Sequence, residues 1–282
     1  MRSVFVAMYR VRSVIFAAST VALLCLAFFA RYFPANVAET ITIVLGGLGF
    51  GGWVLAGLLM FNGGSMRPSH SSVTVASPVH GRWLAINSPA SRTPSHGTRA
   101  YGQSHAVDLI FEPEGWQRPE FGSWPGMREP EDYRAFGQPV HAMISGTVVR
   151  ASDWRRDHKS RTNSVTFLYL MAEGTVRELG GPGFVVGNHV VIRGDDGTYA
   201  AVAHLQRGSL QVRKGDRIEA GDHIANCGNS GNSSEPHVHA QLMDRGSFWT
   251  GQGIPVEFAH IAIDDGDVLE SGMPKNQQHL TR

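Results

Sequence analysis

The segment GNHVVIRGDDGTYAAVAHL, residues 187–205, consists of two apolar runs on either side of the polar turn GDDG. Alternating β-branched and aromatic residues around an Asp-Gly turn are typical of a β-hairpin. Residues 140–152 and 210–228 show the same pattern of short apolar runs separated by glycine-containing turns. Short strands at this spacing predict a mainly β domain, folded as an antiparallel sheet or sandwich.

Residues 164–181, SVTFLYLMAEGTVRELGG, interrupt the strand pattern. Apolar residues recur there with the spacing of a helix, and the run ends in a glycine pair. This pattern predicts a helix inserted between strands. Because a minimal sheet domain does not need such a helix, we expect it either to wall a substrate groove or to lie against a membrane surface.

The N-terminal part of the chain has the composition of a membrane anchor. Residues 14–30 and 40–66 contain no charged residue, and a helix needs about 20 apolar residues to cross a bilayer. We therefore predict two transmembrane helices at about residues 13–31 and 40–62. A signal peptide is the alternative for the first run, because arginines precede it, but the apolar stretch is long for a signal peptide.

Changes in composition define the predicted domains. Residues 1–66 form the membrane anchor, 67–79 a polar linker, 80–265 the globular domain and 266–282 a C-terminal tail. The formal net charge is +1, and no dense run of Lys and Arg occurs along the chain. A nucleic-acid partner is therefore not expected.

Histidine is the residue type from which a metal site could be built, because the chain has thirteen histidines but only two cysteines. In SSEPHVHAQL, residues 233–242, His237 and His239 would share one face of a strand. Adjacent imidazoles repel when protonated and pack poorly, so a metal ion is the usual reason for such a pair. We interpret His141 and His189, in other β runs, as surface or packing residues.

Two more segments supply residues of the kind that bind metals. Asp108 lies in the strand-like run HAVDL, and His204 ends the run AAVAHL just before a turn. One carboxylate and several histidines at strand ends fit a zinc hydrolase site, which keeps three protein ligands and leaves one position open for water.

At residues 187–242, the order AHL, VRKGD, AGD and GNSGNSSEPHVH resembles the lysostaphin-type (LytM-type) zinc metallopeptidases, and HAVDLIF is a weaker match. The resemblance implies that Asp108 and His239 bind one Zn²⁺ ion. It also implies that His204 and His237 are the catalytic residues that flank the metal-bound water, where they accept a proton or stabilise the oxyanion. The implied substrates are stem or cross-bridge peptides of bacterial peptidoglycan.

The third zinc ligand departs from the family pattern, which has a histidine four residues before the aspartate. Ser104 occupies that position. His105 is three residues from Asp108 and would reach the metal only if a β-bulge turned it inward. His96 lies in the loop TPSHGTRAYGQ, which could fold back over the strand. We expect His96 to be the ligand, with His105 as the alternative and a degenerate site as the third reading.

These features predict a membrane-anchored zinc metalloendopeptidase at the bacterial plasma membrane, with peptidoglycan and the lipid bilayer as partners. The alternative is a non-catalytic wall-binding or regulatory module. Arg2, Arg10 and Arg12 favour a cytoplasmic N-terminus, and two crossings would then return the domain to the cytoplasm. We weight the location of the substrate more heavily and predict that the catalytic domain is extracytoplasmic.

Overall fold

The computed structural model describes residues 2–63 and 70–282. The chain divides into an N-terminal unit that extends to Ser69 and a second compact unit, His70–Arg282. Of the predicted linker, residues 67–69 lie outside the described residues.

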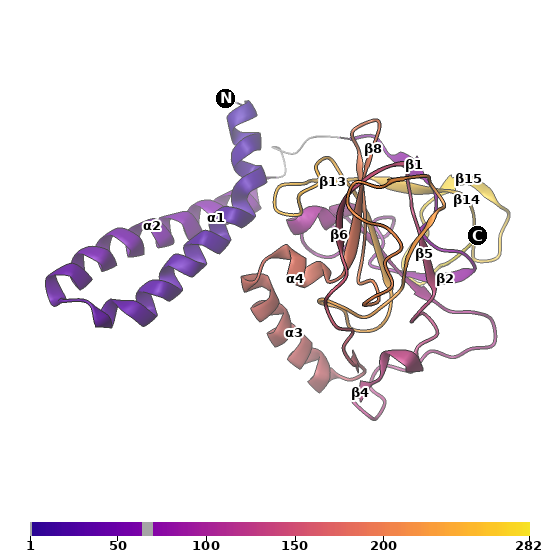
Figure 1. Cartoon of the computed structure of the whole chain (residues 1–282), viewed down its shortest axis with the longest axis horizontal. Helices are drawn as coiled ribbons and strands as arrows, with labels where there is room; N and C mark the ends of the chain where they lie inside the picture. The colour runs from indigo at the N-terminus through magenta and orange to yellow at the C-terminus, as the bar shows by residue number, and fades with distance from the viewer. Residues whose placement is uncertain (1, 64–69) are drawn as a thin grey trace. The chain divides into compact units, whose positions relative to one another are not determined.

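The N-terminal unit is a helical hairpin (Figure 1). Helices α1 (Arg2–Phe29) and α2 (Ala35–Asn62) are joined by the short 3₁₀ helix η1 (Ala30–Tyr32). Both α-helices are long and apolar enough to cross a membrane. Both helices begin earlier than the predicted starts at residues 13 and 40, because polar residues are also helical here. One of them, Arg12, donates to the Tyr9 carbonyl at 2.7 Å.

The second unit is built on one large sheet. Its order is β1-β14-β16-β2-β3-β12-β9-β8-β6-β10, with β13 beside β12 and β15 beside β14. The pairs are antiparallel except for β1 with β14. The strands are β1 (Val73–Val75), β2 (Arg82–Ile86), β3 (Val107–Phe111), β6 (Gly146–Ser152), β8 (His189–Gly194), β9 (Tyr199–Ala203), β10 (Arg217–Ile218), β12 (Val238–Met243), β13 (Gly253–Ile254), β14 (Val256–Ile263), β15 (Leu269–Gly272) and β16 (His279–Thr281).

Two small sheets and several short helices complete the unit. The remaining strands pair as β5 (Pro139–His141) with β11 (His223–Asn226), and β4 (Met127–Arg128) with β7 (Ser160–Arg161). The 3₁₀ helices are η3 (Ala100–His105) and η4 (Pro130–Asp132). The mainly β prediction is confirmed, and β8 and β9 form the antiparallel hairpin expected around GDDG.

The structure corrects the predicted boundaries of the globular domain. Residues 73–75, assigned to the linker, form β1 beside β14. The predicted tail at 266–282 contains β15 and β16, and β16 lies inside the large sheet with Leu280 fully buried. These strands are three or four residues long, which is too short for alternation to be recognised in the sequence.

Alternation along β12 separates the two faces of the sheet. Val238, Ala240 and Leu242 belong to the main hydrophobic core, which also includes residues of β5 and β11. His239 and Gln241 therefore stand on the opposite face. Residues with metal-binding chemistry are thus kept apart from the main core by strand geometry alone.

The predicted helical insert is present as α3 (Ser164–Leu179). It begins at a capping box, in which Asn163 Oδ1 accepts from the Thr166 amide at 3.0 Å and Thr166 Oγ1 accepts from the Asn163 amide at 3.3 Å. The short helix α4 (Pro182–Val186) follows and contacts α3 (Figure 1).

Candidate active site

Pairing of β12 with its two neighbours brings the predicted residues together. His239 lies opposite Asp108 of β3 on one side and opposite Ala203 of β9 on the other. His204 follows β9 with a φ of 62°, which turns the chain out of the strand. A non-glycine residue in this left-handed region costs about 1–3 kcal/mol, and such strain is concentrated at functional sites.

The loop between β2 and β3 carries His96 back over β3. His96 Nε2 lies 3.0 Å from Asp108 Oδ2, and His239 Nδ1 lies 2.9 Å from Asp108 Oδ1. One ligand atom from each of these three residues lies within 4.8 Å of the others. Among the described residues, His105 is not part of this group; it ends η3, and its Nδ1 is 3.0 Å from Ser104 Oγ.

Hydrogen bonds on its far side orient the His239 ring. His239 Nε2 lies 2.8 Å from Gln241 Oε1, and the Gln241 amide is itself oriented by donating to the Tyr101 carbonyl at 3.0 Å. The proton is therefore on Nε2, which leaves the lone pair of Nδ1 pointing to Asp108. A histidine that ligates a metal is typically held in this way by its other ring nitrogen.

Hydrogen bonds also orient the His96 ring. Its Nδ1 lies 3.0 Å from Ser95 Oγ, and that hydroxyl donates to the Gln103 carbonyl at 3.2 Å. Ser95 must then accept from Nδ1, so the lone pair of Nε2 points to Asp108. Two imidazole nitrogens and a carboxylate converge on one point, and a metal ion between them would bind all three. This donor set fits zinc, which binds histidine and carboxylate.

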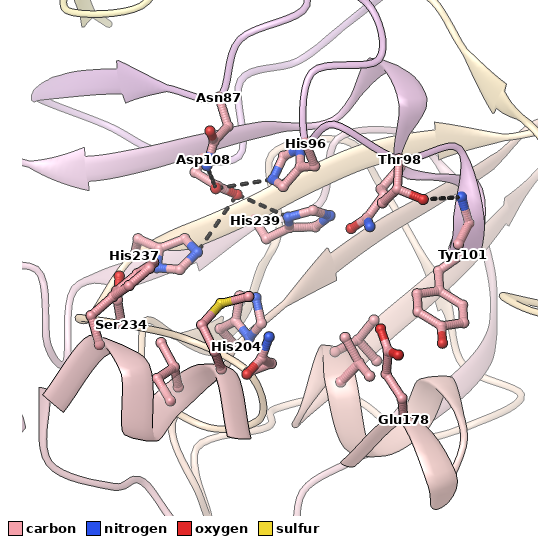
Figure 2. Close-up of a pocket in the computed structure, with 18 residues that line it drawn as sticks. Asn87, His96, Thr98, Tyr101, Asp108, Glu178, His204, Ser234, His237 and His239 are labelled. Atoms are coloured by element: carbon pink, nitrogen blue, oxygen red, sulfur yellow. Dashed lines mark hydrogen bonds and ion pairs between the residues drawn. The ribbon is translucent and has the colours of Figure 1, made fainter. Parts of the chain in front are cut away.

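His204 and His237 stand beside this group with their rings 4.8 Å apart (Figure 2). His204 Nδ1 donates to the Ser230 carbonyl and His237 Nδ1 to the Glu235 carbonyl, both at 2.8 Å. This leaves Nε2 as the nitrogen of each ring that is not bonded to a backbone carbonyl. His237 Nε2 lies 3.5 Å from Asp108 Oδ1.

Burial and neighbouring charges shift the pKa values of Asp108, His204 and His237 in different directions. Burial alone would raise the pKa of Asp108, but His96, His237 and His239 hold that pKa well below its ordinary value. Burial, with His237 and His239 nearby, lowers the pKa of His204, so this ring is neutral and can accept a proton. Burial also opposes protonation of His237, but Asp108 prevails and raises the His237 pKa. Neighbouring groups with separated pKa values are typical of acid–base sites.

A cavity of about 440 Å³ opens in front of the site and is shared between the sheet, the His96 loop and the helical insert. Phe167, Leu170 and Met171 of α3 line one wall, with Val185 and Val186 from α4. Figure 2 shows Glu178 on the same helix, on the side of the cavity across from Asp108. The insert therefore contributes a largely apolar wall next to the histidines.

Sequence reasoning missed two residues that hold the site in place. Gln241 could have been found, because it is two residues after His239 and so shares its face of β12. Asn87 gives no such signal: it follows β2, and its side-chain amide donates to Asp108 Oδ2 at 2.8 Å. Only the pairing of β2 with β3, which places Ile86 opposite Asp108, brings Asn87 to the site.

Residues 129–250 match the sequence model of peptidase family M23. The globular domain belongs to this family. The match confirms the family resemblance that the sequence suggested, and it covers His204, His237 and His239. Asp108 and His96 precede the matched residues, so their part in the site is supported by geometry.

Several solved structures are similar to the M23 domain at low sequence identity. The catalytic domain of lysostaphin from Staphylococcus simulans is 22% identical over 65% of this chain and 88% of that chain, with a TM-score of 0.32. A putative glycyl-glycine endopeptidase LytM from Ruminococcus gnavus is 14% identical over 86% and 82%, with a TM-score of 0.33. A zinc-containing peptidase from Vibrio cholerae is 15% identical over 67% and 40%, with a TM-score of 0.30.

Proposed function

We propose that the chain is a membrane-anchored, zinc-dependent endopeptidase that hydrolyses peptide bonds of bacterial peptidoglycan. The observation that carries the proposal is the set of four histidines around Asp108. One nitrogen of each ring is held by an oxygen atom, and the other faces the site. Membership of family M23 supports a peptidase, and the resemblance to lysostaphin-type enzymes supports a cell-wall substrate.

Each residue has a separate task in this proposal. His96, Asp108 and His239 hold one Zn²⁺ ion, which supplies a Lewis acid and an activated water when bound. The neutral His204 accepts a proton from the attacking water. His237 stabilises the negative charge that develops on the scissile carbonyl oxygen.

The helical hairpin gives the proposed enzyme its location. If α1 and α2 cross the plasma membrane, the M23 domain is confined to the layer of cell wall nearest to the bilayer. An extracytoplasmic domain is required, because peptidoglycan lies outside the membrane.

The test measures metal content and hydrolysis on the full-length protein in detergent. The wild type should bind one zinc ion and release new amino termini from purified peptidoglycan. His239→Ala and Asp108→Ala should lose the metal. His204→Ala and His237→Ala should keep the metal and lower the rate by about 100-fold or more.

The outcomes of this test distinguish the proposed enzyme from a non-catalytic module. A wild-type protein that holds zinc and binds peptidoglycan without cleaving it would favour a non-catalytic wall-binding module. A protein that stays metal-free after zinc is added would refute the metallopeptidase proposal. Loss of zinc from His237→Ala, with zinc retained by His239→Ala, would reverse the roles within the His237–His239 pair.

A further inference from the structure

The outward face of α3 is apolar along its whole length. Val165, Leu168, Val176 and Leu179 are 76%, 69%, 68% and 53% exposed. With the exposed Ala172 between Leu168 and Val176, every step is three or four residues, which puts these side chains on one side of the helix. Among the exposed residues of α3, Glu178 alone is charged, and it lines the cavity. A surface helix of a globular protein normally presents polar residues to water, so this face is suited to contact with another apolar phase.

Exposed aromatic side chains lie near both ends of the helix. Phe121 is 64% exposed and packs against Phe167 on the cavity side of α3, with ring centroids 6.3 Å apart. Beyond the other end, the rings of Trp154 and Phe184 are 6.1 Å apart, and the Arg155 guanidinium lies 4.2 Å from the Trp154 ring. Aromatic rings combined with arginine are suited to the interfacial layer of a bilayer, which satisfies apolar and polar groups together.

The short connection to α2 identifies the bilayer as the occupant. Residues 63–69 separate α2 from the second unit, and an extended chain of this length spans about 25 Å. If α2 crosses a bilayer, a domain on such a tether stays close to the membrane surface. We propose that the outward face of α3 lies on the lipid bilayer as an interfacial helix. This inference rests on the membrane-anchor part of the proposed function.

The arrangement would place the active site close to the lipid. An α-helix with its side chains is about 10–12 Å across, and α3 lines the cavity with the side opposite to its outward face. The site would then open within about one helix diameter of the bilayer surface. Peptides on wall material still near the membrane would be the accessible substrates.

Fluorescence quenching in proteoliposomes tests the inference on the full-length protein. Cys25 is exposed on α1 and Cys227 is buried, so a thiol-reactive probe on Cys25 reports on the anchor. In a Cys25→Ala background, Leu168→Cys and Val176→Cys report on α3, and Lys214→Cys in an exposed polar turn is the matched control. Nitroxide-labelled phospholipids should quench the probes at 168 and 176 several-fold more strongly than the probe at 214.

The labels distinguish the ways in which the inference can fail. Strong quenching at Cys25 with weak, equal quenching at 168, 176 and 214 would overturn the α3 inference and leave the anchor intact. Absence of quenching at Cys25 would overturn the anchor and, with it, the α3 inference. Probes at 168 and 176 that are shielded from aqueous iodide but not quenched by the lipids would show that protein covers this face instead.

A separate observation concerns the substrate. Glu178 lines the cavity, and its carboxylate makes no hydrogen bond or ion pair with the described residues. No Lys or Arg lines the cavity among the described residues, while Asp108, the other carboxylate there, is engaged by histidines. We infer that Glu178 binds a primary ammonium group of the substrate peptide, such as the side-chain amine of a diamino acid. This inference also rests on the proposed function.

Binding and turnover are measured separately on the zinc-loaded protein, with one synthetic stem peptide carrying a free side-chain amine and a second carrying the same amine acetylated. Acetylation should raise Kd and KM about tenfold for the wild type, with kcat unchanged, and should have little effect on Glu178→Gln. Glu178→Lys should prefer the acetylated peptide. Equal Kd values of both peptides for the wild type would overturn the inference about Glu178, whereas binding without cleavage would count against the proposed peptidase.

Discussion

His96 is separated from the other site residues by twelve positions or more, yet its ring lies 3.0 Å from Asp108. The strand position that carries a histidine in the family pattern is occupied here by Ser104, whose small side chain is buried. A loop histidine thus reaches the place where a strand histidine is expected. The same point of the site is approached from a different part of the backbone.

The assignment of the third ligand is tested by a pair of alanine variants. His96→Ala removes an imidazole that faces Asp108, so we expect loss of zinc binding and of hydrolysis. His105→Ala removes a ring outside this group, and zinc content should stay at the wild-type level. Metal analysis of the two purified full-length proteins checks this, and the reverse result would assign the ligand to His105.

His189 predicts a pH dependence of stability. The ring is buried, its Nδ1 lies 2.8 Å from the Gly187 carbonyl, and burial lowers its pKa from 6.5 to about 4. The unfolded chain binds the proton at higher pH than the folded chain does, so the contribution is complete above pH 6.5 and is lost as pH falls toward 4. Between pH 7 and pH 5 the loss should be about 2 kcal/mol.

Denaturant unfolding of the wild type and of His189→Gln checks this prediction. The variant has no titrating group at this position, so its free energy of unfolding should fall less between pH 7 and pH 5. Identical pH dependence of both proteins would mean that His189 does not contribute.

At the scale of elements, a local sequence signal positions α3, which forms one wall of the cavity. Asn163 and Thr166 start the helix through reciprocal hydrogen bonds, and Gly180 follows its last residue. The wall of the cavity therefore depends on the cap as well as on packing.

Asn163→Ala should destabilise α3 by about 1 kcal/mol, the usual effect of removing an N-cap side chain. Amide hydrogen exchange within the helix should become about fivefold faster as local opening increases. Zinc content should be unchanged, because α3 supplies none of the proposed ligands. Ser164→Ala, at an exposed position beside the cap, is the matched control, and equal exchange in both variants would contradict the proposed role of the cap.

At the scale of the whole molecule, two apolar helices precede a domain that belongs to family M23. We expect protease added to intact spheroplasts to digest the domain, because its proposed substrate lies outside the membrane. A protein known to be cytoplasmic serves as the protected control. If the domain is digested only after the membrane is permeabilised, it is cytoplasmic and the charge bias of Arg2, Arg10 and Arg12 determines the topology.

Local patterns in the sequence were sufficient for the β class, the β8–β9 hairpin, helix α3 and the family. These features depend on alternation, turn residues and helical spacing, which act over a few neighbouring residues. The face shared by His237 and His239 follows from the same periodicity. The short strands β1 and β16 could not be predicted, because three residues form a strand only when neighbours such as β14 and β2 supply hydrogen bonds.

The spatial grouping of His96, Asp108 and His239 was decided by tertiary structure. Sequence alone left His96 and His105 as alternatives, because loop conformation depends on contacts that are distant along the chain. Ser95 and Gln103 orient the His96 ring, and strand pairing brings Asn87 to Asp108. The sequence determined which chemical groups were available, and long-range packing decided which of them face one another, because these contacts form only once the sheet has assembled.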